Sequence, residues 1–294
     1  MRKFLIVLFC VLSWASDGDK SEWYRECVKE CSQTHVVEGY LKLFWSVEAD
    51  CKYKCMREHN KMRKERGLKT VQYHGKWPFK RYFGCQEIAS VVFSIGNAWA
   101  QYRGYRKVNW RIKNSVMHRY WLGALILNLN GWLWSTVFHA RDTKWTERLD
   151  YFSAAALVLY ALYHTLVSLM ALYIKPIADY ALCTMFFLFY VLHVRKLLII
   201  FDYGYNMAVI GGVGFLFNLL LIVAYLKGWT KSKFAPICGI LFIAAGSLEI
   251  FDFEPVMEIF DAHSLWHLAT IPIGFVLWRY LAEHAMELPN QINL

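Results

Sequence analysis

The apolar residues of this chain are gathered in long runs rather than in short periodic stripes. Seven runs approach the roughly 20 residues that a helix needs to cross a bilayer, and polar stretches separate them. The pattern therefore predicts an all-α membrane protein, a bundle of seven transmembrane helices in which a tight turn near Lys175 joins the third helix to the fourth. The predicted spans are residues 82–101, 120–138, 151–173, 176–194, 205–226, 234–251 and 264–281.

The first residues have the features of a secretory signal peptide. Arg2 and Lys3 form a short basic start, the apolar core that follows is too short to span a membrane, and Ser13 and Ala15 are small residues that suit a cleavage site. We therefore predict a signal peptide over residues 1–15 and a mature amino terminus in the secretory lumen. An uncleaved anchor is the alternative interpretation.

Residues 16–81 form a polar luminal segment with four cysteines in two C-x-x-x-C pairs. Residues four apart share a helix face, and the secretory lumen is oxidising, which favours disulfides over a zinc site. Two antiparallel helices would allow the pairs Cys27–Cys55 and Cys31–Cys51, although spacing alone does not choose among three connectivities. We expect a disulfide-stapled helical segment, because so small a module buries little core unaided, followed by a membrane domain over residues 82–294.

The charge pattern predicts the orientation in the membrane. The formal net charge is +10, but the basic residues gather in loops between apolar runs, which argues against a nucleic-acid partner. With a luminal amino terminus, residues 102–119 and 227–233 face the cytoplasm, and both loops carry basic residues without acidic ones. The acidic loop at residues 252–261 falls on the luminal side. This distribution follows the positive-inside rule.

Five side chains suited to catalysis lie at the predicted luminal ends of three spans. Ser135 and His139 are one helical turn apart at the end of the second span, and Asp150 opens the third. His263 and His267 are one turn apart at the start of the seventh. Ionisable residues are costly in a membrane and therefore indicate function.

The three histidines predict a zinc site. Three imidazoles leave the fourth tetrahedral position open for water, which zinc makes acidic enough to ionise near neutral pH. In this hypothesis Asp150 accepts the proton of that water or orients a histidine, and Ser135 donates to the oxyanion of a tetrahedral intermediate. The reaction would be hydrolysis of an ester or amide among lipid headgroups.

Each of these residues also has a structural interpretation. A serine within a helix often bonds to its own backbone, and histidines four apart are common by chance. Asp150 could instead favour the start of a helix, while Asp142 and Asp261 are competitors for the acidic role. Glu249 lies near the luminal end of the sixth span and could reach the site.

Together these motifs resemble known families. The S-x-x-x-H of Ser135 and His139, the aspartate at 150 and the H-x-x-x-H at 263–267 are similar, in order and placement, to the signature of the CREST superfamily of seven-span metal-dependent hydrolases. That superfamily includes alkaline ceramidases and the progestin and adiponectin receptors. The signal peptide, the four-cysteine segment and the strings WSTVFHARDT, FDYGYNM and DAHSLWH resemble, more narrowly, the GPI-anchor lipid-remodelling phospholipase family, the post-GPI-attachment factors.

The resemblance implies a GPI-specific phospholipase A2-type hydrolase, which removes the sn-2 acyl chain from the anchors of glycosylphosphatidylinositol (GPI)-anchored proteins during lipid remodelling. It implies a multi-pass protein of the Golgi or endoplasmic reticulum membrane, with a zinc-dependent site that faces the lumen, and with GPI-anchored proteins and membrane lipids as partners. Two other functions stay open: a ceramidase-like lipid amidase with the same site, and a non-enzymatic seven-span receptor or folding factor.

Overall fold

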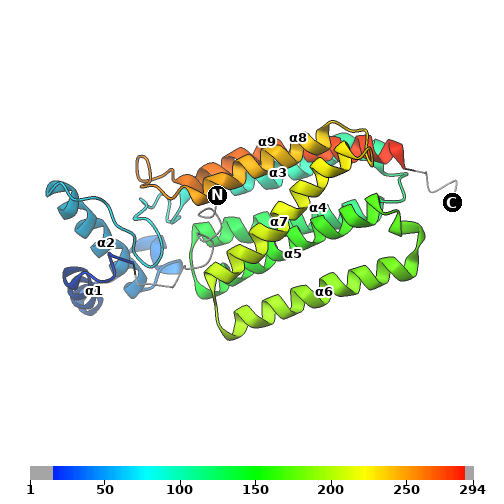
Figure 1. Cartoon of the computed structure of the whole chain (residues 1–294). Coiled ribbons are helices and arrows are strands. Elements are labelled where there is room, and N and C mark those ends of the chain that lie inside the picture. Colours follow the sequence, from blue (N-terminus) through cyan, green and yellow to red (C-terminus); the bar gives the residue numbers. More distant parts are fainter. Residues whose placement is uncertain (1–15, 289–294) are drawn as a thin grey trace, which may run out of the picture. The chain divides into compact units, whose positions relative to one another are not determined.

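A computed structural model describes residues 16–288, and within this range the regular elements are all helical (Figure 1). The signal peptide predicted over residues 1–15 lies outside the described residues. The chain forms two compact units. The first holds the described residues up to Ala89 together with Asp252–Asp261, and the second holds Ser90–Phe251 and the described residues from Ala262 onward.

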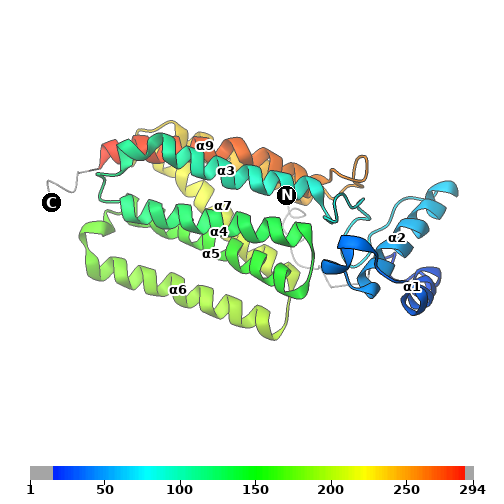
Figure 2. The ribbon, with the colours of Figure 1, turned by 180° about the vertical axis from the view of Figure 1, so that it is seen from behind.

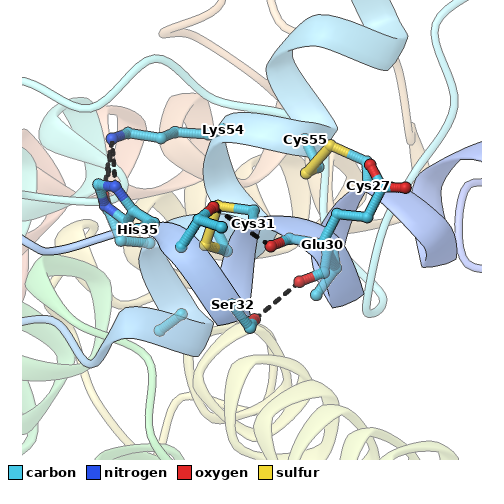
Figure 3. The surroundings of a disulfide bond; sticks show 12 residues. Cys27, Glu30, Cys31, Ser32, His35, Lys54 and Cys55 are labelled. Carbon is cyan, nitrogen blue, oxygen red and sulfur yellow. Dashed lines mark hydrogen bonds and ion pairs between the residues drawn. A yellow bond between two sulfur atoms is a disulfide. The ribbon is translucent and has the colours of Figure 1, made fainter.

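The first unit is built on two stapled helices, α1 (Glu22–Thr34) and α2 (Val47–Glu65), with a short 3₁₀ turn, η1 (Gly39–Leu43), between them. Serine side chains cap both helices by accepting a backbone N–H, as is usual at a helix start. The disulfides are Cys27–Cys55 and Cys31–Cys51. Figure 3 shows Cys27 and Cys31 on the side of α1 that faces α2. The prediction of disulfides is confirmed, with the pairing that antiparallel helices allow.

The acidic segment Asp252–Asp261 is built into this first unit by ion pairs. Arg57 Nη2 lies 2.6 Å from Glu258 Oε2, and Lys64 Nζ lies 3.2 Å from Glu254 Oε1. Burial raises the pKa of the Glu258 carboxyl, but the hydrogen bond and charge of Arg57 outweigh that effect and hold the pKa below its usual value. The segment that leads into the last helix is therefore held by the amino-terminal part of the chain.

Between Ile88 and Glu287, seven α-helices fall on the seven predicted apolar runs. Of the described helices, α5, α6 and α7 are long and apolar enough to cross a membrane by length and composition. The α-helices are α3 (Ile88–Ile112), α4 (His118–Ala140), α5 (Lys144–Leu169), α6 (Pro176–Ile199), α7 (Tyr203–Leu226), α8 (Phe234–Gly246) and α9 (Ala262–Glu287), with 3₁₀ turns η2 (Leu172–Ile174) before α6 and η3 (Ser247–Ile250) after α8.

Helices α3 and α5 extend furthest beyond their predicted spans. Helix α3 continues through basic residues to Ile112, although the predicted span ends at residue 101. Helix α5 begins at Lys144 rather than at 151, because Thr143 and Thr146 form a reciprocal capping box that satisfies its first N–H groups. Hydropathy marks only the apolar part of a helix, whereas capping and hydrogen bonding decide where it ends.

Close packing of α3 against α9 sets one wall of the second unit (Figure 2). A Cβ atom at Gly104 would lie 2.6 Å from the Trp278 ring, so a glycine is needed for the two helices to approach this closely. Trp278 Nε1 then donates to Gln101 Oε1 over 2.8 Å. The contact brings the polar residues of α3 to the helix that carries His267.

Candidate active site

The structure brings the three predicted histidines together within the second unit. His139 is at the carboxyl end of α4, and His263 and His267 occupy the first two turns of α9. The Nε2 atom of His263 lies 3.0 Å from that of His267 and 3.3 Å from that of His139. One ligand atom from each ring lies within 4.8 Å of the other two.

This donor set fits a divalent metal ion. Two ligand nitrogens on a tetrahedral zinc, each bound at about 2.0–2.1 Å, stand roughly 3.3 Å apart. The observed separations of 3.0 and 3.3 Å are close to that value. His139 and His267 are each only 2% exposed, and imidazole is a ligand that suits zinc and other late transition metals. The cluster can therefore hold a metal, and the identity of the metal stays a prediction.

A carboxylate sets the orientation of His263. Its Nδ1 atom lies 2.8 Å from Oε1 of Glu249, which stands in η3. An ionised carboxylate only accepts hydrogen bonds, so Nδ1 donates and the Nε2 lone pair is left for the cluster. The position of Glu249 near the end of the sixth run was the sequence signal for this contact.

Sequence reasoning missed Ser94, a buried residue of α3. Its Oγ atom lies 3.5 Å from His267 Nδ1 and 3.0 Å from Ser135 Oγ. One turn further along α3, Asn97 Nδ2 donates to the backbone carbonyl of His267 over 2.7 Å. The only signal in the sequence is a pair of polar residues one turn apart in an apolar helix.

Ser135 uses its hydroxyl in a contact between helices. Among the described residues, its Oγ atom bonds to Ser94 on another helix rather than to a backbone carbonyl of α4. The neighbouring hydroxyl, Thr136 Oγ1, does bond back to the carbonyl of Trp132, over 2.7 Å. A hydroxyl that bonds to the backbone of its own helix therefore describes Thr136, not Ser135.

Asp150 is half-buried in α5 at the same end of the bundle as the histidines. It stands beyond the first turn of a helix that begins at Lys144 and is capped by Thr143, so it is not a capping carboxylate. The ring of the next residue, Tyr151, packs edge-on against Phe138 at 5.9 Å, and Phe138 precedes His139. The catalytic role of Asp150 stays a prediction.

Two indole rings enclose His267. The ring of Trp266 lies 4.7 Å from the imidazole of His267, and the ring of Trp132 on α4 lies 5.5 Å from it, both edge-on. Apolar surroundings of this kind reduce the access of water and strengthen the electrostatic interactions of the groups inside.

The helices and the histidine cluster define a helical membrane protein with a candidate metal centre at one end of its bundle. The chain belongs to the Per1-like family, whose model matches residues 40–285. No solved structure matches the chain.

Relatives that match nearly the whole chain include proteins of two names. The chain is 33% identical to a protein of Danio rerio named GPI-specific phospholipase A2-like PGAP3, over 94% of this chain and 92% of that one. It is 32% identical to the Homo sapiens protein of the same name, over 98% and 95% of the two chains. It is 36% identical to the Protein PER1 homolog of Schizosaccharomyces pombe, over 96% and 93%.

Proposed function

We propose that this protein is a GPI-specific phospholipase A2-type hydrolase, which uses zinc to remove the sn-2 acyl chain from the anchors of GPI-anchored proteins. The convergence of His139, His263 and His267 from two helices carries the proposal, because it supplies the ligands of a hydrolytic metal. The names of the relatives support GPI as the substrate. The products would be a free fatty acid and a GPI with one acyl chain fewer.

The proposal includes a seven-span topology in the Golgi or endoplasmic reticulum membrane, with the site facing the lumen. Polar contacts such as that of Arg57 with Glu258 join the amino-terminal segment to Asp252–Asp261 in one compact unit. Because such a unit cannot straddle hydrocarbon, both segments lie on one side of the membrane. This supports an even number of crossings between them, in agreement with the six predicted spans.

In the proposed mechanism, the residues of the chain position the ester and move its proton. Zinc held by His139, His263 and His267 would make available a water that ionises near neutral pH. The Asp150 carboxylate accepts the proton of the attacking water and returns it to the glycerol oxygen as the ester C–O bond breaks. Ser135 Oγ donates to the carbonyl oxygen as it becomes negative. Glu249 and Ser94 hold His263 and His267 in the orientations that face the cluster.

Replacing Ser135 by alanine should lower kcat by about 10²-fold, because a donor to the oxyanion contributes that much. Zinc content should not change, since Ser135 is not a ligand. The control is Thr136→Val, which removes a hydroxyl from the same helix that bonds only to its own backbone. Fatty acid release from GPI by purified protein measures the effect. Turnover equal to that of the wild type in Ser135→Ala would show that this serine is not an oxyanion donor and serves only in packing.

Replacing Glu249 by alanine should weaken zinc binding by about 10–100-fold, because partners of metal-bound histidines have effects of that size. Competition with a chelator of known affinity measures the change. The control is Glu283→Gln, which alters another carboxylate that contacts Arg279 and Ser232. Equal zinc affinity in Glu249→Ala and the wild type would show that the Glu249–His263 contact does not support a metal.

The function itself is tested by mass spectrometry of GPI lipids from cells that lack the protein. Retention of the original sn-2 chains, with reversal by the wild type but not by His267→Ala, is the expected result. Altered ceramide with normal GPI lipid would instead identify a ceramidase-like amidase. Normal GPI and normal ceramide would favour the receptor or folding-factor alternative.

A further inference from the structure

The first compact unit has a polar cavity that opens to solvent at its surface and that the proposed hydrolysis does not use. Its volume is about 210 Å³. The walls come from three stretches of the chain: the residues before α1, those after α2 and the acidic segment before α9. The lining residues are Asp17, Thr70, Val71, Gln72, Trp77 and Asp252.

Hydrogen bonds hold the polar walls of this cavity in place. The carboxylate of Asp252 accepts from Trp77 Nε1 over 2.6 Å and from Gln72 Nε2 over 2.8 Å. Thr70 Oγ1 donates to Glu254, two residues further along the same acidic segment. A ligand would therefore meet groups that are already oriented, which lowers the entropic cost of binding.

The wall that carries Asp17 is fixed by a glycine. The Gly18 N–H donates to the carbonyl of Gln72 over 3.0 Å. A Cβ atom at Gly18 would lie 2.6 Å from that oxygen and 2.5 Å from the Tyr73 ring, so only glycine allows the two stretches to meet. Asp17 itself is largely exposed and pairs with Lys20 at 2.9 Å.

The chemistry of the lining suits a sugar. Carboxylate and amide oxygens accept from hydroxyl groups, the threonine hydroxyl can donate or accept, and an indole offers an apolar surface for the C–H face of a sugar ring. Among the residues that the structure describes, the lining has two carboxylates and no lysine or arginine, which disfavours a phosphate or a carboxylate ligand. The volume is on the scale of one sugar ring rather than of an acyl chain.

We propose that this cavity binds one sugar ring of the glycan that the lipid substrate carries. The inference rests on the proposed function, because that function supplies a glycolipid as substrate. It explains how the protein would distinguish a GPI from an ordinary phospholipid, which has the same ester but no sugar. Asp252 follows Glu249 by three residues in the sequence, so the glycan site and the carboxylate that orients His263 share one short stretch of chain.

The test uses the full-length protein in detergent and the water-soluble headgroup freed from a GPI by removing its lipid. This probe has no ester, so the wild type can be titrated without turnover. Calorimetry should show binding that Asp252→Asn and Trp77→Phe each weaken by about tenfold, because the first change removes a charged acceptor and the second removes the N–H that orients it. Asp17→Asn, at an exposed position that the fold tolerates, should weaken binding in the same direction. Glu65→Gln, a surface carboxylate of the same unit, should bind as the wild type does.

Hydrolysis gives an independent measurement. In vesicles that contain GPI, the KM of Asp17→Asn and Asp252→Asn should rise by about tenfold. Headgroup binding that is absent in the wild type, or equal in the wild type and all three cavity variants, would overturn the inference even if GPI is hydrolysed. Headgroup binding that depends on Asp252, in a protein that releases no fatty acid, would overturn the proposed hydrolysis and leave the glycan site standing.

Discussion

Replacing His267 by alanine is expected to abolish both zinc binding and fatty acid release. His267 is buried and its Nε2 is 3.0 Å from His263 Nε2, so its loss leaves two nitrogens where a stable tetrahedral site requires three. Zinc affinity should fall by more than the roughly 10–100-fold typical of an outer partner, and turnover should drop below detection. His139→Ala should behave in the same way.

Measuring the zinc content of purified His267→Ala and His139→Ala, together with their folding, distinguishes loss of the metal site from misfolding. Both variants should remain in the membrane fraction and keep the disulfides Cys27–Cys55 and Cys31–Cys51, which lie in the other compact unit. His118→Ala is the matched control, because His118 begins α4 and His139 lies near its end. A normal zinc content in His267→Ala or His139→Ala would remove that histidine from the ligand set.

Replacing Asp150 by asparagine should have the opposite signature: zinc is retained while turnover falls by about 10²–10⁴-fold, the range for the loss of a general acid–base group. Asparagine keeps the shape of the side chain but cannot accept a proton. Asp150 lies beyond the capped first turn of α5, so the change leaves the helix cap formed by Thr143 intact. Zinc content and initial rates, measured on one preparation, give both quantities.

The control for this experiment is Asp142→Asn, which removes another carboxylate near the start of α5. A similar loss of turnover in Asp142→Asn would mean that Asp142 competes with Asp150 for the role of proton acceptor. An unimpaired rate in Asp150→Asn would exclude this residue from the proton transfer.

The positions of the helices were predictable because lipid requires long apolar segments, and α3 to α9 fall on the seven apolar runs. The proximity of His139 to His263 was also predictable, since counting spans places the end of the second and the start of the seventh on one side. The helix ends were less predictable. The capping box at Thr143 extends α5 through polar residues that hydropathy assigns to a loop.

Other features depend on contacts between distant parts of the chain, which no periodic pattern records. The disulfide pairing depends on α1 and α2 running antiparallel, and spacing alone left three connectivities. The pair formed by Arg57 and Glu258 spans 201 residues of sequence. Ser94 was missed because a serine in an apolar helix has no signature until His267 is placed beside it.

In the proposed function, His139, His263 and His267 hold the metal that makes this protein a hydrolase of GPI. The most direct measurement is release of the sn-2 fatty acid from GPI in vesicles by the purified protein before chelation, after chelation and after return of zinc. We expect release to stop when the metal is removed and to return when about one zinc ion per chain binds, but not in His267→Ala. Release that continues undiminished in the metal-free protein would contradict the account.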